Sequence, residues 1–178
     1  MKKFIITTVL SLLAFPLLAN TSAPHAMHEV REIKVLSPQQ ISAYLNGKGL
    51  GFGKAAELNQ FPGPSHVLEL ATELNLSKEQ VSQTQKIFER MKAQASKLGR
   101  LYVEKEQELD LHFSVSTIDS VSLKTRITDI GKLQASIRYV HLNAHLEQKA
   151  ILTKHQIQRY DQLRGYSQLN SSIHSPSH

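Results

Sequence analysis

Two six-residue segments of this chain are nearly the same, and each predicts the start of a helix. They are residues 76–81 (LSKEQV) and 152–157 (LTKHQI). In each, a hydroxyl at the N-cap can accept from a free backbone N–H, and a glutamine three residues later can accept from the N–H of the cap. A leucine before the cap can pack on the apolar residue at the fourth helical position. The residues of these two capping boxes are Leu76, Ser77, Gln80, Leu152, Thr153 and Gln156.

Between the two boxes, apolar residues recur at helical spacing in two long runs. The first runs from residue 78 to about 112 and the second from about 117 to 151. The pattern breaks at residues 113–116, and Ser116 or Thr117 is the predicted cap of the second helix. Because a short connection makes two long helices antiparallel neighbours, the two boxes are expected to lie close together in space.

Short helices are expected on either side of this hairpin. Ser65 follows a Pro-Gly-Pro break and is predicted to cap a helix that runs to about Leu74. The other short helix starts at Thr153 and stops before Gly165, since glycine suits the position after a helix end. With four main helices and no convincing strand, the predicted fold class is all-α: a long antiparallel helical hairpin flanked by short helices.

The first 19 residues have the layout of a secretory signal peptide. Two lysines are followed by an apolar run of about 15 residues and then by Ala19. A membrane anchor is the alternative, but the run is shorter than the roughly 20 residues that a spanning helix needs. We therefore expect export to the periplasm, no stable membrane anchor, and cleavage after Ala19, with Ala23 or Ala26 as alternative sites.

Residues 20–64 are expected to form an N-terminal arm with one short helix and a glycine-rich loop. The arm is expected to be flexible up to Ser37, which is followed by proline and predicts a capped helix to Leu45. The loop at 47–53 (GKGLGFG) follows no strand and lacks the Lys-Ser/Thr ending of a phosphate-binding loop. We expect it to pack over the hairpin.

The helical domain itself is expected at residues 65–166, and a disordered tail at 167–178. The chain carries a formal charge of +6, of which Lys2 and Lys3 supply two, so +4 remains after signal removal. Such a surface can attract anionic partners. An exported protein rarely meets nucleic acid, and none is predicted as a partner.

Several chemistries are excluded or disfavoured. The absence of cysteine excludes disulfides, thiolate metal sites and a cysteine nucleophile. No Gly-x-Ser-x-Gly motif or cofactor fingerprint is present, and the neighbouring acids Glu104 and Glu108 indicate a solvated face. We therefore predict a protein that is not an enzyme, has no catalytic residues and requires no cofactor.

Together, the signal peptide, the hairpin and the Leu-Ser/Thr-x-x-Gln boxes resemble the LTXXQ family of periplasmic proteins. That family includes Spy- and CpxP-like chaperones and the related ZraP- and CnrX-like metal-responsive proteins. The resemblance covers about residues 66–166. Ser77 stands where the family usually has threonine, and Lys154-His155 where Pro-Glu is common, but both boxes keep their capping chemistry.

The resemblance implies a curved, all-helical homodimer that binds unfolded or misfolded envelope proteins without ATP, or that acts in an envelope stress response. A role as the partner of an envelope sensor protein is a further possibility. Cations interleaved with apolar residues along both long helices suit the binding of non-native chains, although such cations are also typical of ordinary solvated helix faces. These candidate client-binding residues are Lys86, Arg90, Lys97, Arg100, Arg126, Lys132 and Arg138.

Three histidines form a candidate metal site. His141 and His145 are spaced i, i+4, which places both rings on one helix face, a common arrangement for binding a divalent metal. His66 lies on the first short helix, which must pack near this end of the hairpin. The alternative function is thus binding of zinc, nickel or copper, and the alternative structure is partly buried histidines that hydrogen-bond locally. The candidate carboxylate ligands are Glu69, Glu89 and Glu147.

Overall fold

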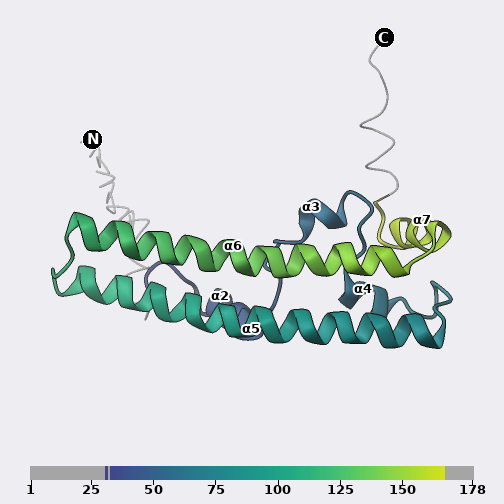
Figure 1. The fold of residues 1–178 in the computed structure, drawn as a ribbon, viewed down its shortest axis with the longest axis horizontal. Helices are drawn as coiled ribbons and strands as arrows, with labels where there is room; N and C mark the ends of the chain where they lie inside the picture. The colour runs from purple at the N-terminus through teal and green to yellow at the C-terminus, as the bar shows by residue number, and fades with distance from the viewer. Residues whose placement is uncertain (1–30, 32, 167–178) are drawn as a thin grey trace, which may run out of the picture.

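Two long helices dominate the molecule. The computed structural model describes residue 31 and residues 33–166, and every regular element in that part of the chain is a helix. Helix α5 (Lys78–Ser114) and helix α6 (Ser120–Ile151) lie side by side along the length of Figure 1. The predicted all-α fold is confirmed for these residues.

The predicted signal peptide (1–19) and the predicted disordered tail (167–178) lie outside the described residues. Among the helices that are described, none is both long and apolar enough to span a lipid bilayer.

Four shorter helices pack around the hairpin: α2 (Pro38–Leu45), α3 (Lys54–Glu57), α4 (Pro64–Glu69) and α7 (Lys154–Leu163). Helix α2 contacts α5, α3 contacts α6, and α4 contacts both long helices (Figure 1). Helix α2 has the predicted bounds and the predicted cap, Ser37. Helix α3 was not predicted, because it is a single turn after the glycine-rich loop.

Both predicted capping boxes form. Ser77 Oγ accepts from the backbone N–H of Gln80 at 3.1 Å, and Thr153 Oγ1 accepts from that of Gln156 at 3.2 Å. Each glutamine Oε1 accepts in return from the N–H of its own cap, at 3.0 and 2.9 Å. The boxes also bond to each other, because the amides of Gln80 and Gln156 donate to one another's Oε1 at 2.9 and 3.0 Å. Their predicted proximity, and with it the antiparallel arrangement, is confirmed.

Two apolar clusters stabilise the described fold. One lies midway along the hairpin and includes Tyr44 of α2, Tyr102 of α5 and Ile137 of α6. It also contains Ile33 and Leu36, which the sequence places in a flexible arm. Packed structure therefore begins before α2, because these two side chains complete the core between the helices.

The second apolar cluster lies at the open end, where α4 and α7 meet. Leu152 is buried in it and half-buried Ile157 packs against it, so the hydrophobic staple predicted for α7 forms. The staple predicted for α5 is looser: Leu76 joins the cluster, but Val81 is 37% exposed.

The start of α6 differs from the prediction. Its cap is Asp119, whose carboxylate accepts from the N–H groups of Val121 and Ser122, and not Ser116 or Thr117. Ser116 instead lies just after the C-cap of α5, Val115. It has a positive φ of 54°, and the N–H of Thr117 bonds back to the His112 carbonyl, as in a Schellman motif.

The start of α4 also differs. Its cap is Gly63, and Pro64 occupies the first helical position, where its fixed φ and missing N–H suit a helix start. Ser65 lies one position inside the helix and donates to the Glu69 carboxylate at 3.3 Å. The helix ends at Glu69, and turns continue to Asn75, which has a positive φ of 48°.

Candidate functional site

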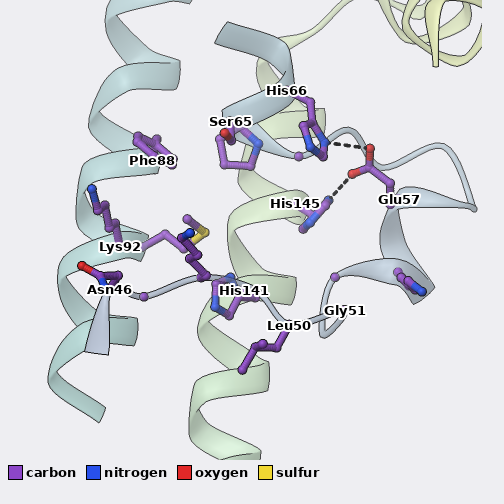
Figure 2. Close-up of a pocket in the computed structure, with 18 of the residues that line it drawn as sticks. Asn46, Leu50, Gly51, Glu57, Ser65, His66, Phe88, Lys92, His141 and His145 are labelled. Atoms are coloured by element: carbon purple, nitrogen blue, oxygen red, sulfur yellow. Dashed lines mark hydrogen bonds and ion pairs between the residues drawn. The ribbon is translucent and has the colours of Figure 1, made fainter. Parts of the chain in front are cut away.

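A buried carboxylate connects four segments beside the hairpin. Glu57, at the end of α3, is 8% exposed. Its Oε1 accepts a hydrogen bond from the hydroxyl of Tyr160 in α7 and lies 3.2 Å from Nδ1 of His66 in α4. Its Oε2 lies 3.6 Å from Nδ1 of His145 in α6 (Figure 2). Glu57 therefore ties α3 to α4, α6 and α7.

The surroundings of Glu57 favour its ionised form. Burial acts to raise the pKa of Glu57, but hydrogen bonds from His66 and Tyr160, together with the charges of His66 and His145, outweigh burial and lower the pKa below its usual range. Burial and the adjacent carboxylate raise the pKa of Tyr160. The Tyr160 hydroxyl is therefore the donor and Glu57 the acceptor.

Further donors surround this carboxylate. Arg164 Nε lies 3.8 Å from Glu57 Oε1, and the Tyr166 hydroxyl donates to the same oxygen at 3.4 Å. His145 Nδ1 lies 2.7 Å from the carbonyl oxygen of Phe61. Because a carbonyl only accepts, this contact requires a hydrogen on Nδ1 of His145. The cluster is thus a satisfied anion within a shell of donors.

The predicted three-histidine cluster does not form in the described part of the chain. His66 and His145 both contact Glu57, but His141 packs against Phe52, with ring centroids 6.3 Å apart. The i, i+4 spacing places both α6 rings on one face, yet it leaves them one turn apart, and each has its own partners. His141 is 5% exposed, and its Nε2 finds no hydrogen-bond partner among the described residues.

The three carboxylates considered as metal ligands are engaged elsewhere. Glu69 accepts from Ser65, Glu89 accepts from Gln85, and Glu147 pairs with Arg90. Across residues 31 and 33–166, no group of three or more histidine, aspartate or glutamate side chains is placed to hold a metal ion. Divalent-metal binding stays an untested prediction.

A cavity of about 800 Å³ opens next to the Glu57 cluster, beneath the glycine-rich loop. The loop packs over the hairpin as predicted. A Cβ added at Gly47 would lie 2.6 Å from the Lys92 carbonyl oxygen of α5, and one added at Gly53 would lie 2.5 Å from His145 Nε2 of α6. Figure 2 shows side chains from the loop, α4, α5 and α6 around this hollow.

Most of the predicted client-binding cations lie on the surface, and three of the seven form ion pairs. Arg90 forms an ion pair with Glu147, and half-buried Arg126 contacts Glu108 and His112. Lys132 lies 3.9 Å from Asp129. The other four are exposed and make no ion pair with another described residue: Lys86, Lys97, Arg100 and Arg138.

Sequence reasoning missed Glu57, which organises the site. The available signal was weak: a run of good helix formers, Lys54 to Glu57, placed between the glycine-rich loop and a proline break. That run predicts one helical turn at most. It does not reveal that the turn packs on α6 and directs its acid toward two histidines.

The buried state of His141 predicts an acid-sensitive stability. Burial, with a smaller effect from the charge of His145, lowers the pKa of His141. The unfolded chain therefore binds more protons, and the free energy of unfolding should fall as pH drops below 6.5, by at most about 1.4 kcal/mol per pH unit. His141→Phe should remove this loss, as measured by urea unfolding between pH 7.5 and 5.5.

The exposed His155 offers the control for that measurement. His155→Asn should keep the wild-type loss of stability, and an equal loss in His141→Phe would contradict the prediction.

The contribution of Glu57 to the free energy of unfolding depends on pH in a lower range. Because its pKa is lowered by folding, that stabilisation is present above pH 4.5 and is lost as the pH falls further.

Comparison of the chain with models of protein families, with curated proteins and with solved structures found no match in any of the three.

Proposed function

We propose that this protein binds non-native polypeptides on the outer surface of the α5–α6 hairpin. The observation that carries the proposal is a set of large apolar side chains that remain exposed on both long helices and their connection. Helices α2, α3 and α4 pack against the hairpin, whereas these side chains remain exposed in the described structure. These exposed residues are Val81, Leu101, Leu111, Phe113, Val115, Val121, Ile127, Tyr139 and Leu146.

Three of these side chains lie on one face of α6. Val121, Tyr139 and Leu146 are 77%, 67% and 55% exposed. Their separations of 18 and 7 residues are close to whole numbers of helical turns, so the three side chains share a face. Lys132 lies on the same face, seven residues before Tyr139. Dispersed apolar contacts around a cation suit an extended, chemically varied ligand better than a folded partner of fixed shape.

The unpaired cations support the same function. Lys86, Lys97 and Arg100 are exposed along the outside of α5, and Arg138 is exposed on α6. Positive charge accelerates encounter with acidic segments, while apolar contacts prolong the complex. The resemblance to the LTXXQ family adds the expected setting: action in the periplasm after signal removal, as a homodimer and without ATP.

Suppression of aggregation tests this proposal. Purified protein is mixed at near-stoichiometric ratios with insulin, whose reduction causes its chains to aggregate, and light scattering is followed. The wild type should suppress most of the scattering, and Val121→Ser/Tyr139→Ser/Leu146→Ser should lose most of that effect with little change in melting temperature. Val35→Ser/Leu58→Ser, at exposed apolar positions outside the hairpin, should retain it. Absence of suppression by the wild type would contradict the proposal.

A further inference from the structure

We propose that the cavity beneath the glycine-rich loop binds a small organic anion, a carboxylate joined to an apolar body. The cavity lies between the glycine-rich loop, α3, α4, α5 and α6, and the end of α7 also contributes to it (Figure 2). It is separate from the exposed apolar face of α6. This inference therefore does not rest on the proposed polypeptide-binding function.

The charge of the lining favours an anion. Lys48, Lys54, Lys92 and Arg164 line the cavity, and Glu57 is the one acid among the described residues that do so. Glu57 is already surrounded by its own donors, whereas the three lysines are exposed and make no ion pair with another described residue. A divalent cation would be repelled by this lining, and a carboxylate would be attracted.

Apolar side chains line the same cavity beside these cations. Phe88 and Met91 of α5, both half-buried, line the cavity together with Leu50 of the loop. A volume of about 800 Å³ lies within the range of roughly 300–1,000 Å³ that is typical of small-molecule sites. Apolar walls with a few convergent polar groups are the usual composition of such sites. A ligand that combines one anionic group with an apolar body matches both the cations and the apolar side chains of the lining.

An unsatisfied polar group also lies in this lining. His141 is one-twentieth exposed, and its Nε2 is buried without a hydrogen-bond partner among the described residues. Buried polar atoms are rarely left unpaired. The loop approaches the ring closely, since a Cβ added at Gly49 would lie 3.6 Å from His141 Nδ1. Because the loop approaches Nδ1, Nε2 is the ring nitrogen that stays available to a polar group of a ligand.

Calorimetry with decanoate tests the proposal. The full-length protein should bind decanoate, and should bind decanol, decylammonium and acetate far more weakly, because each of these lacks the anionic group or the apolar body. Lys48→Gln/Lys92→Gln should weaken decanoate binding by about fivefold to tenfold, since each lost surface charge contributes up to about 1 kcal/mol. Both lysines are exposed, so the fold should persist, as circular dichroism would verify.

The matched control is Lys86→Gln/Lys97→Gln, which removes two exposed cations of α5 that do not line the cavity. It should bind decanoate as the wild type does. Absence of decanoate binding, equal affinity for decanol, or an equal loss in both double variants would overturn the proposal. Because insulin aggregation is scored separately, failure here is distinguishable from failure of the polypeptide-binding function.

Discussion

Gly99→Ala is expected to lower the free energy of unfolding by about 2–3 kcal/mol, although alanine is the better helix former. A Cβ at this position would lie 2.2 Å from the carbonyl oxygen of Tyr44 and 2.8 Å from its carbonyl carbon. Both are backbone atoms of α2, so no side-chain rotation relieves the overlap. Helix α2 would have to move away from α5, and that movement would separate the rings of Tyr44 and Tyr102, whose centroids are 4.6 Å apart.

Gly131→Ala provides the matched control in the other long helix. A Cβ at Gly131 meets no atom within 4 Å, and the residue is exposed near the middle of α6. Alanine should therefore stabilise the protein by about 0.5–1 kcal/mol through helix propensity alone. Urea unfolding followed by far-ultraviolet circular dichroism measures both changes. Stabilisation by Gly99→Ala would contradict the close approach of α2 to α5.

This pair of glycines shows what the sequence could predict and what it could not. In both runs the helical spacing of the apolar residues predicts a long helix, and each glycine indicates only a slightly lower helix propensity. Gly99 acquires its role from α2, about fifty residues away in the sequence. Nothing local in the α5 pattern reveals that backbone contact, because it depends on where a separate element docks.

The helix boundaries show a second kind of limit. Ser116, Thr117 and Asp119 all have side chains that can cap a helix. Asp119 is the N-cap of α6 because α5 continues to Ser114. Ser116 then adopts the left-handed backbone conformation that follows the end of α5. Where several possible N-cap residues lie close together in the sequence, the end of the preceding helix determines which of them caps the next helix. The local sequence pattern alone does not determine it.

The candidate site was predicted in part. Helical spacing places His141 and His145 on one face of α6, and the loop at 47–53 packs over the hairpin as expected. The partners of the histidines were not predictable from spacing. His145 and His66 share Glu57, which comes from a one-turn helix with no strong sequence signal, whereas His141 packs against Phe52. Long-range packing therefore places two of the histidine rings beside the Glu57 carboxylate and the third beside the Phe52 ring.

Gln156→Glu is expected to lower the free energy of unfolding by about 2–4 kcal/mol. Local rules predict the opposite, because glutamate is a standard partner in a capping box and an acid is favoured in the first turn of a helix. In this protein, however, Gln156 is 8% exposed, and its Nε2 donates to Gln80 Oε1 at 3.0 Å and to the Leu74 carbonyl at 3.3 Å. The substitution removes both hydrogen bonds. It also places a buried carboxylate next to two oxygen atoms that can only accept, the Gln80 Oε1 and the Leu74 carbonyl.

Gln40→Glu separates this long-range effect from capping itself. Gln40 forms the same box with Ser37 at the start of α2, but it is exposed, and its amide makes no bond to any other described helix. Glutamate should therefore be neutral there, or stabilising by up to about 0.5 kcal/mol. If both substitutions were neutral in urea unfolding at pH 7, the direct bond between the two boxes would not contribute to stability.

The pH dependence of the Gln156→Glu defect gives a sharper criterion. Burial among acceptors should raise the pKa of the introduced carboxyl above its value in the unfolded chain. The folded variant then binds more protons than the unfolded one, so its deficit relative to the wild type should shrink as the pH falls toward 4.5. The protonated carboxyl also regains one donor for the Gln80 or Leu74 oxygen. A deficit that stays constant with pH would contradict a buried carboxylate here, because it would mean that the carboxyl has the same pKa in the folded and unfolded chains.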